Sequence, residues 1–183
     1  MGYPKIAKFD KEFASRTLAN VENFEHTNSF THLINSLIGL IIIPRQFNLT
    51  KARKYKVDFL KINIADCPEI CALFDGEEEL IDEAGTKYKQ PKFFFKDKNG
   101  ARTINDTNVG ELVSLFRHGI AHSNITPVSD DSGVHWKGII VKNYKNQSDE
   151  KNGDYNFQTF LDQDGLRHFA TYIAKQYVAN AII

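Results

Sequence analysis

Three side chains that can carry out acid–base or phosphate chemistry lie close together in the second half of the chain: Arg117, His118 and His122. Arginine stays charged throughout the physiological pH range, whereas histidine gains and loses a proton near neutral pH. An arginine can hold a phosphate through two parallel hydrogen bonds, and a histidine can exchange a proton with an attacking or leaving oxygen. In RNA the attacking group is the neighbouring 2′-hydroxyl, so this pairing requires no metal ion. The stretch therefore contains groups suited to cleaving a phosphodiester.

The same residues allow two other interpretations. His118 and His122 are four residues apart, so on a helix they share one side and could bind zinc. Gly119, however, occupies the place of the glutamate in the HExxH motif, and the sequence offers no obvious third ligand. Alternatively, the histidines are hydrogen-bonded, partly buried features of a core helix, and Arg117 lies on its solvated side. Spacing alone leaves these interpretations open.

The element that must position these residues is predicted to be a helix from Glu111 to Asn124. Its apolar residues recur at the spacing of a buried helix face: Leu112, Leu115, Phe116 and Ile120. Arg117 and His122 are five residues apart, so on a regular helix they project about 140° apart. Gly119 between them indicates tight packing or a local bend.

Three further helices and two strands are expected around this helix. A run from Val134 to Asn143 and another from Tyr155 to Leu161 are typical of strands and should pair as a hairpin. Each helix is predicted to start at a polar capping residue. The expected starts are Asp10 for the first helix, Asn28 or Ser29 for a central core helix that ends at Pro44, Asp106 or Thr107 for the helix above, and Asp162 or Asp164 for the last.

Residues 45–105 have a weaker pattern and are expected to form a partly β or irregular insertion between helices. A hairpin is predicted at Asn99-Gly100, and the acidic residues 75–83 should form a short polar helix or loop. Two basic stretches, 51–56 and 87–102, contain lysines near Tyr55, Tyr88 and Phe93 to Phe95. These residues could contact phosphates and stack on bases, or they could be solvated strand edges and core.

Composition limits the class of protein. A chain of 183 residues suits one domain, and its 42% hydrophobic content is sufficient for a packed core. The formal net charge is zero, so nucleic-acid binding would need a local patch. Cys67 and Cys71 lack the CxxC spacing and are expected to be reduced thiols. With no leader and no bilayer-spanning stretch, we expect a cytoplasmic location and no membrane partner.

The stretch from Leu115 to Asn124 resembles the Arg-polar-x3-His signature of the HEPN superfamily, the higher eukaryote and prokaryote nucleotide-binding domains. The segment Asn35 to Arg45 is similar to the helix-to-proline segment of the plasmid- and phage-associated HEPN nuclease branch. Ile125 to Pro127, followed by the strand at Trp136 to Val141, is also similar to that branch. The resemblance covers most of the chain except the middle insertion.

This resemblance implies a mainly α fold. The expected architecture is a single HEPN-like helical bundle over residues 1–183, with a small β-hairpin before the C-terminal helix and the insertion at 45–105. Two copies would dimerise with their signature helices facing each other, so that one composite cleft contains both arginine–histidine pairs.

The implied function is that of a metal-independent endoribonuclease, with RNA as its substrate and no cofactor. Arg117 and His122 match the catalytic arginine and histidine, and His118 matches the polar position that follows the arginine. His118 and Asn124 are candidates for substrate binding. Such proteins often act in toxin–antitoxin, abortive-infection or anti-phage systems, where an antitoxin protein can be a partner. The alternative is a non-catalytic HEPN module that binds RNA, nucleotide or a partner protein.

Overall fold

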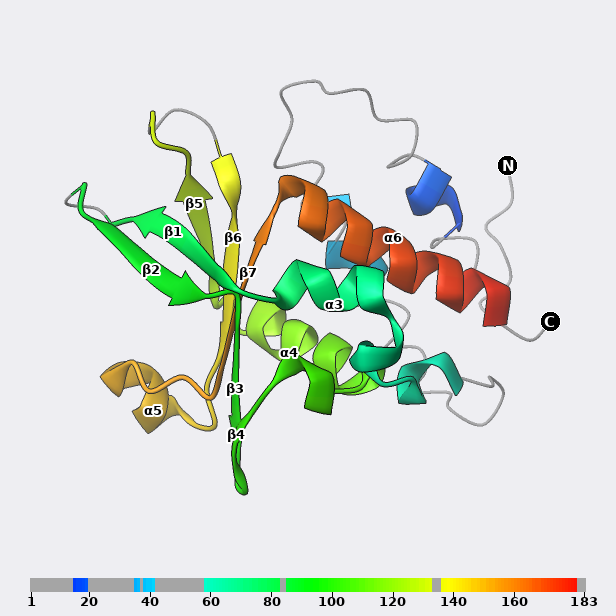
Figure 1. Ribbon diagram of the computed structural model, residues 1–183, viewed down its shortest axis with the longest axis horizontal. Helices are drawn as coiled ribbons and strands as arrows, with labels where there is room; N and C mark the ends of the chain where they lie inside the picture. Colours follow the sequence, from blue (N-terminus) through cyan, green and yellow to red (C-terminus); the bar gives the residue numbers. More distant parts are fainter. Residues whose placement is uncertain are drawn as a thin grey trace.

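A computed structural model describes residues 15–19, 35–36, 38–41, 58–82, 85–132 and 136–180 of the chain. These residues form a five-stranded antiparallel sheet with the longer helices on one side and, on the other, a separate two-stranded hairpin and the short helix α5 (Gln147–Asn152) (Figure 1). The helices are α3 (Pro68–Phe74), α4 (Val109–Ala121), α5 (Gln147–Asn152) and α6 (Gln163–Asn180). The strands are β1 (Glu77–Ile81), β2 (Lys87–Pro91), β3 (Phe93–Asp97), β4 (Gly100–Arg102), β5 (Ile125–Ser129), β6 (Trp136–Asn143) and β7 (Phe157–Asp162).

The strand order of the sheet is β4-β3-β7-β6-β5, which makes β4 and β5 its edges. In the central pair, Ile139 lies opposite Leu161 and Val141 opposite Thr159. Directly opposed residues share a face, and Ile139, Val141 and Leu161 belong to the same buried cluster as residues of α3, α4 and α6. These helices cover that side of the sheet (Figure 1). We call this side the helix-covered face and the opposite side the far face.

Aromatic rings join the helices to the helix-covered face. Phe74 of α3, Phe116 of α4 and Phe169 of α6 are fully or almost fully buried. The Phe74 and Phe169 rings meet edge to face with centroids 5.4 Å apart, and Phe116 contacts Phe157 of β7 at 6.0 Å. Such buried aromatic pairs stabilise a core beyond the area that they remove from water. Helices α3, α4 and α6 therefore share a single core with the sheet.

A smaller cluster lies on the far face, where the hairpin β1–β2 packs on the sheet. It consists of Leu80, Val128, Ile140 and Phe160, all less than one tenth exposed. Lys137 extends from β6 to this hairpin, where its Nζ lies 2.6 Å from Glu78 Oε1 and 2.8 Å from the carbonyl of Glu79. The hairpin thus covers one part of the far face.

The prediction of a mainly α helical bundle was wrong. Residues 58–82 and 85–105 do not form an insertion beside a bundle, because Phe93, Phe94 and Phe95 lie in β3 and pair with β7 inside the sheet. Phe93 and Phe95 join the core on the helix-covered face, whereas Phe94 lies on the far face, where its ring contacts Tyr155. A strand with apolar residues on both faces lacks the alternation of apolar and polar residues by which strands are recognised.

Several local predictions were confirmed. The turn before Gly100 joins β3 and β4, β6 and β7 pair as expected, and the Oδ1 atom of Asp162 accepts a hydrogen bond from the Gly165 amide at the start of α6. The acidic segment, by contrast, contains strand β1 rather than a helix or loop.

The two N-terminal helices are described only in part. Residues 15–19, 35–36 and 38–41 are helical, and Leu40 and Ile41 are fully buried, as expected for a core helix. The rest of these predicted helices and the basic stretch 51–56 with Tyr55 lie outside the described residues. Among the helices of the described part, none combines the length and apolar character required to cross a bilayer.

Candidate active site on helix α4

Helix α4 carries the arginine–histidine signature, and its start is determined by a side-chain cap. The cap is Asn108, whose Oδ1 accepts a hydrogen bond from the Glu111 amide at 2.8 Å, and not Asp106 or Thr107 as predicted. The apolar stripe is buried as expected, with Leu112 and Phe116 fully covered. Arg117 is half-buried, whereas His118 and His122 are exposed. The buried stripe thus directs the histidines toward solvent.

Gly119 determines how closely the signature approaches the sheet. A Cβ atom at this position would lie 2.4 Å from the carbonyl oxygen of Lys142 and 2.6 Å from Val141 Cγ1. No side-chain carbon fits at such distances, so only glycine allows α4 to pack directly on β6. The tight packing that the sequence indicated is therefore present, and it lies between Arg117 and His122.

The end of the signature is a Schellman motif, a common way to close a helix. The Ser123 amide donates to the Ile120 carbonyl at 3.0 Å, and the Asn124 amide donates to the Gly119 carbonyl at 2.8 Å. Ser123 adopts the left-handed conformation with φ 60°, and no other non-glycine residue of the described part has a positive φ. His122 is the C-cap residue. Non-glycine residues in this conformation are often found at functional sites.

Asn124 connects the signature to the sheet. Its carbonyl accepts a hydrogen bond from the Lys142 amide at 2.9 Å, immediately before β5 begins. The Asn124 side chain is half-buried. The backbone after His122 is therefore held by both the helix and strand β6.

Within one protomer the signature residues do not all lie on one side of α4. The His122 amide donates to the His118 carbonyl at 3.1 Å, so these two residues are one turn apart along the same side of the helix. Helical geometry directs Arg117 about 140° away from His122 around the axis. No three histidine, cysteine, aspartate or glutamate residues of the described part cluster to hold a metal ion, so the His118–His122 pair has no third ligand of these types there.

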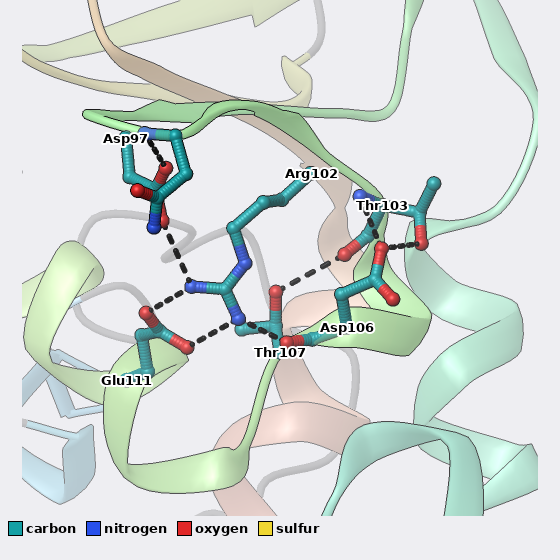
Figure 2. A network of polar contacts seen from close by, with 7 residues as sticks. Asp97, Arg102, Thr103, Asp106, Thr107 and Glu111 are labelled. Atoms are coloured by element: carbon teal, nitrogen blue, oxygen red, sulfur yellow. Dashed lines mark hydrogen bonds and ion pairs between the residues drawn. The ribbon is translucent and has the colours of Figure 1, made fainter.

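A second polar cluster holds the other end of α4, and sequence reasoning missed it (Figure 2). Arg102 donates from both terminal nitrogens to the Glu111 carboxylate, at 2.6 and 3.0 Å, and also to the carbonyl of Asp106. It lies 3.5 Å from Asp97, and its guanidinium stacks on Phe95 with 5.3 Å between Cζ and the ring centroid. The hydrogen bond to Glu111 raises the pKa of Arg102 further.

The sequence places Arg102 in a basic stretch that could contact phosphates. In the structure its donors serve to attach the β3–β4 hairpin to the first turn of α4. Asp106 contributes to the same region, since Thr103 donates to its carboxylate from the hydroxyl at 2.7 Å and from the amide at 3.1 Å. The Thr103 hydroxyl is the main reason that the pKa of Asp106 lies below its ordinary value.

The two cysteines are free thiols near the start of α3, as expected. Cys67 Sγ lies 3.2 Å from the Tyr172 hydroxyl, and Cys71 Sγ lies 3.1 Å from Asn105 Oδ1. Burial raises the pKa of the Cys71 thiol, which lowers its reactivity at neutral pH. Burial and the contact with Cys67 raise the pKa of Tyr172. These residues therefore join α3 to its neighbours.

A hollow of about 230 Å³ lies where α6 begins, away from the signature. Its polar lining consists of Lys92, Asp162, Asp164 and His168. Asp162 caps α6 and Lys92 lies 3.7 Å from Glu78, so two of these charged groups already have partners. None of the signature residues lines this hollow.

A family model described as HEPN pEK499 p136 matches residues 1–182. No curated protein and no solved structure matches the chain. The matched range includes residues 45–105, which the resemblance of the motifs does not cover. The chain belongs to the HEPN pEK499 p136 family.

Proposed function

We propose that this HEPN domain is a metal-independent endoribonuclease with Arg117 and His122 as its catalytic residues. The observation that supports the proposal is the placement of the Arg-x4-His signature. The exposed His122 and the half-buried Arg117 lie at the end of a helix that is locked on the sheet by Gly119 and by the Schellman motif. A rigid backbone with accessible functional groups is what phosphoryl-transfer chemistry requires.

In the proposed reaction, the 2′-hydroxyl of one nucleotide attacks the adjacent phosphorus. The bond from O2′ to phosphorus forms while the bond from phosphorus to O5′ breaks, which leaves a 2′,3′-cyclic phosphate and a 5′-hydroxyl. His122 exchanges the proton with the attacking or leaving oxygen, and Arg117 stabilises the charge that develops on the phosphate oxygens. His118 and Asn124 contact the substrate on either side of His122.

The active form is a two-fold dimer. Because Arg117 and His122 project in different directions from one helix, a second α4 facing the first would bring an arginine and a histidine together. The proposed setting is a toxin–antitoxin or anti-phage system in the cytoplasm, with an antitoxin protein as a possible partner. A monomer at micromolar concentration by light scattering would count against the composite site.

The test is incubation of purified full-length protein with RNA in excess EDTA. The wild type should cleave it, and His122→Ala or Arg117→Ala should reduce the rate by about 10²- to 10⁴-fold. His168→Ala, an exposed histidine on α6, is the matched control and should cleave normally. Intact RNA with the wild type, or equal cleavage by His122→Ala, would contradict the proposal.

A non-catalytic HEPN module is the second candidate. It is favoured by His118, because this position of the signature is commonly asparagine or aspartate. RNA or nucleotide binding that persists in Arg117→Ala and His122→Ala, with no cleavage product from any variant, would support it.

A further inference from the structure

The far face of the sheet is only partly covered. The hairpin β1–β2 packs on it around Leu80 and Phe160, and α5 stands at its other end (Figure 1). Between them a row of residues crosses three strands and ends at Asn124, just before β5. Phe94 of β3 lies opposite Gln158 of β7, Gln158 lies opposite Lys142 of β6, and the Lys142 amide bonds to the carbonyl of Asn124. Residues paired in this way project to the same side of a sheet.

This row offers an aromatic surface beside a cation. The Tyr155 ring meets the Phe94 ring edge to face, with centroids 5.4 Å apart, and Lys142 Nζ lies 5.2 Å from the Tyr155 centroid. All three residues are half-buried, so part of each side chain faces solvent. Gln158 is covered by Gln90, with which it hydrogen-bonds at 3.0 Å. Phe94, Tyr155, Lys142 and Asn124 are therefore the groups that a ligand can contact.

The charges on the far face are divided between two parts. At the hairpin, Lys87 of β2, Lys92 and Lys137 form ion pairs with Glu78 or Glu79 of β1. In the uncovered part, Lys142 and Lys96 have no carboxylate within ion-pair distance among the described residues. Lys96 is two residues from Phe94 and therefore on the same face of β3. The uncovered part thus carries two cations that can bind an anion without first breaking an ion pair.

The row also ends at the signature. Asn124 is two residues after His122, and β5, which follows it, is an edge strand of the sheet. A chain that runs along Phe94, Tyr155 and Lys142 reaches this edge at Asn124, and from there it can pass around the edge to His122 at the end of α4.

We propose that the uncovered far face, formed by Phe94, Lys96, Lys142, Tyr155 and Asn124, binds single-stranded RNA. The aromatic rings stack on unpaired bases, and the lysines bind phosphates. A duplex keeps its bases stacked inside the helix, so they are not accessible to these rings. Binding at this surface does not depend on the proposed function. Only the further step, in which the bound RNA reaches His122 and is cleaved, rests on it.

The test measures binding separately from cleavage. Full-length His122→Ala protein is titrated into a fluorescent single-stranded RNA, and anisotropy is followed at several salt concentrations. Adding Tyr155→Ala should weaken binding about tenfold, whereas Tyr155→Phe should preserve it because the ring remains. Adding Lys142→Ala should weaken binding and reduce the slope of log K against log salt by about 0.7. Lys175→Ala, an exposed lysine on α6, is the control and should change neither.

Crosslinking provides a second measurement, in which no residue of the proposed RNA-binding face is substituted. RNA that contains 4-thiouridine, irradiated with the His122→Ala protein, should label peptides from β3, β6 and the 153–156 segment. Labels elsewhere only, or equal affinities of Tyr155→Ala and the parent, would overturn the inference even if the wild type cleaves RNA. Labels on this face without cleavage by the wild type would overturn the proposed function instead.

Discussion

The two ends of α4 are held by different kinds of contact. At the N-terminal end, side chains hold the helix: Asn108 caps it, and Arg102 binds Glu111 through two hydrogen bonds. At the C-terminal end, backbone contacts hold the helix, through the Schellman motif and the approach of Gly119 to the Lys142 carbonyl.

The difference explains why one end is structural and the other is suited to chemistry. Arg102 uses its terminal nitrogens for internal contacts, so little of the guanidinium remains for a substrate. At the other end the backbone carries the attachment, and His118 and His122 stay exposed. The comparison can be tested at each end separately.

The largest effect is expected at Gly119. Gly119→Ala places a methyl group against the Lys142 carbonyl, which belongs to a paired strand and cannot move aside, so the free energy of unfolding should fall by about 3 kcal/mol. Urea denaturation measures this change. Ser114→Ala, a half-buried position on the same helix, should alter the free energy of unfolding little. An unchanged midpoint for Gly119→Ala would show that α4 does not pack this closely on β6.

The next effect concerns the other end of the helix. Arg102→Ala leaves the largely covered Glu111 carboxylate without its cation, and we expect a loss of about 2 kcal/mol in the free energy of unfolding. Lys87→Ala removes the exposed ion pair with Glu79, where both side chains are about half exposed, and should cost almost nothing. Equal losses for the two variants would contradict a special role of Arg102.

A smaller effect of opposite sign is expected at Ser123. Glycine adopts a positive φ without steric cost, so Ser123→Gly should raise the free energy of unfolding by up to about 1 kcal/mol, and Ser123→Val should lower it. Thermal unfolding of the two variants compares them directly. If the Ser123→Val variant proved more stable than Ser123→Gly, Ser123 would not have the left-handed conformation in solution.

The smallest effect is the pH response of Asp106. Because the folded-state pKa of this carboxyl is lower than its unfolded value, its contribution to stability is complete above the unfolded pKa and is lost as pH falls through the folded pKa. Thr103→Val removes the hydroxyl donor and should raise the Asp106 pKa toward its ordinary range, as measured by NMR titration. An identical titration in both proteins would exclude the hydroxyl as the cause.

The sequence identified some elements because their signals are local. The stripe from Leu112 to Ile120 follows the period of a helix, and Asp162 is a typical capping residue. Strand β5 escaped prediction because it is short, mostly exposed and contains Pro127, which an edge strand tolerates. The pairing of Phe94 with Gln158 joins residues far apart in the chain, and no local pattern reports such a contact.

The sequence by itself determined which helix carries the arginine–histidine signature, where its apolar stripe lies and that Gly119 required an explanation. Only the tertiary structure decided that the core contains a five-stranded sheet, that Arg102 hydrogen-bonds to Glu111 and that Gly119 lies against Lys142. The physical reason is that helical periodicity and capping depend on neighbouring residues. The partner of a strand, a charge or a glycine depends on which distant segment lies opposite.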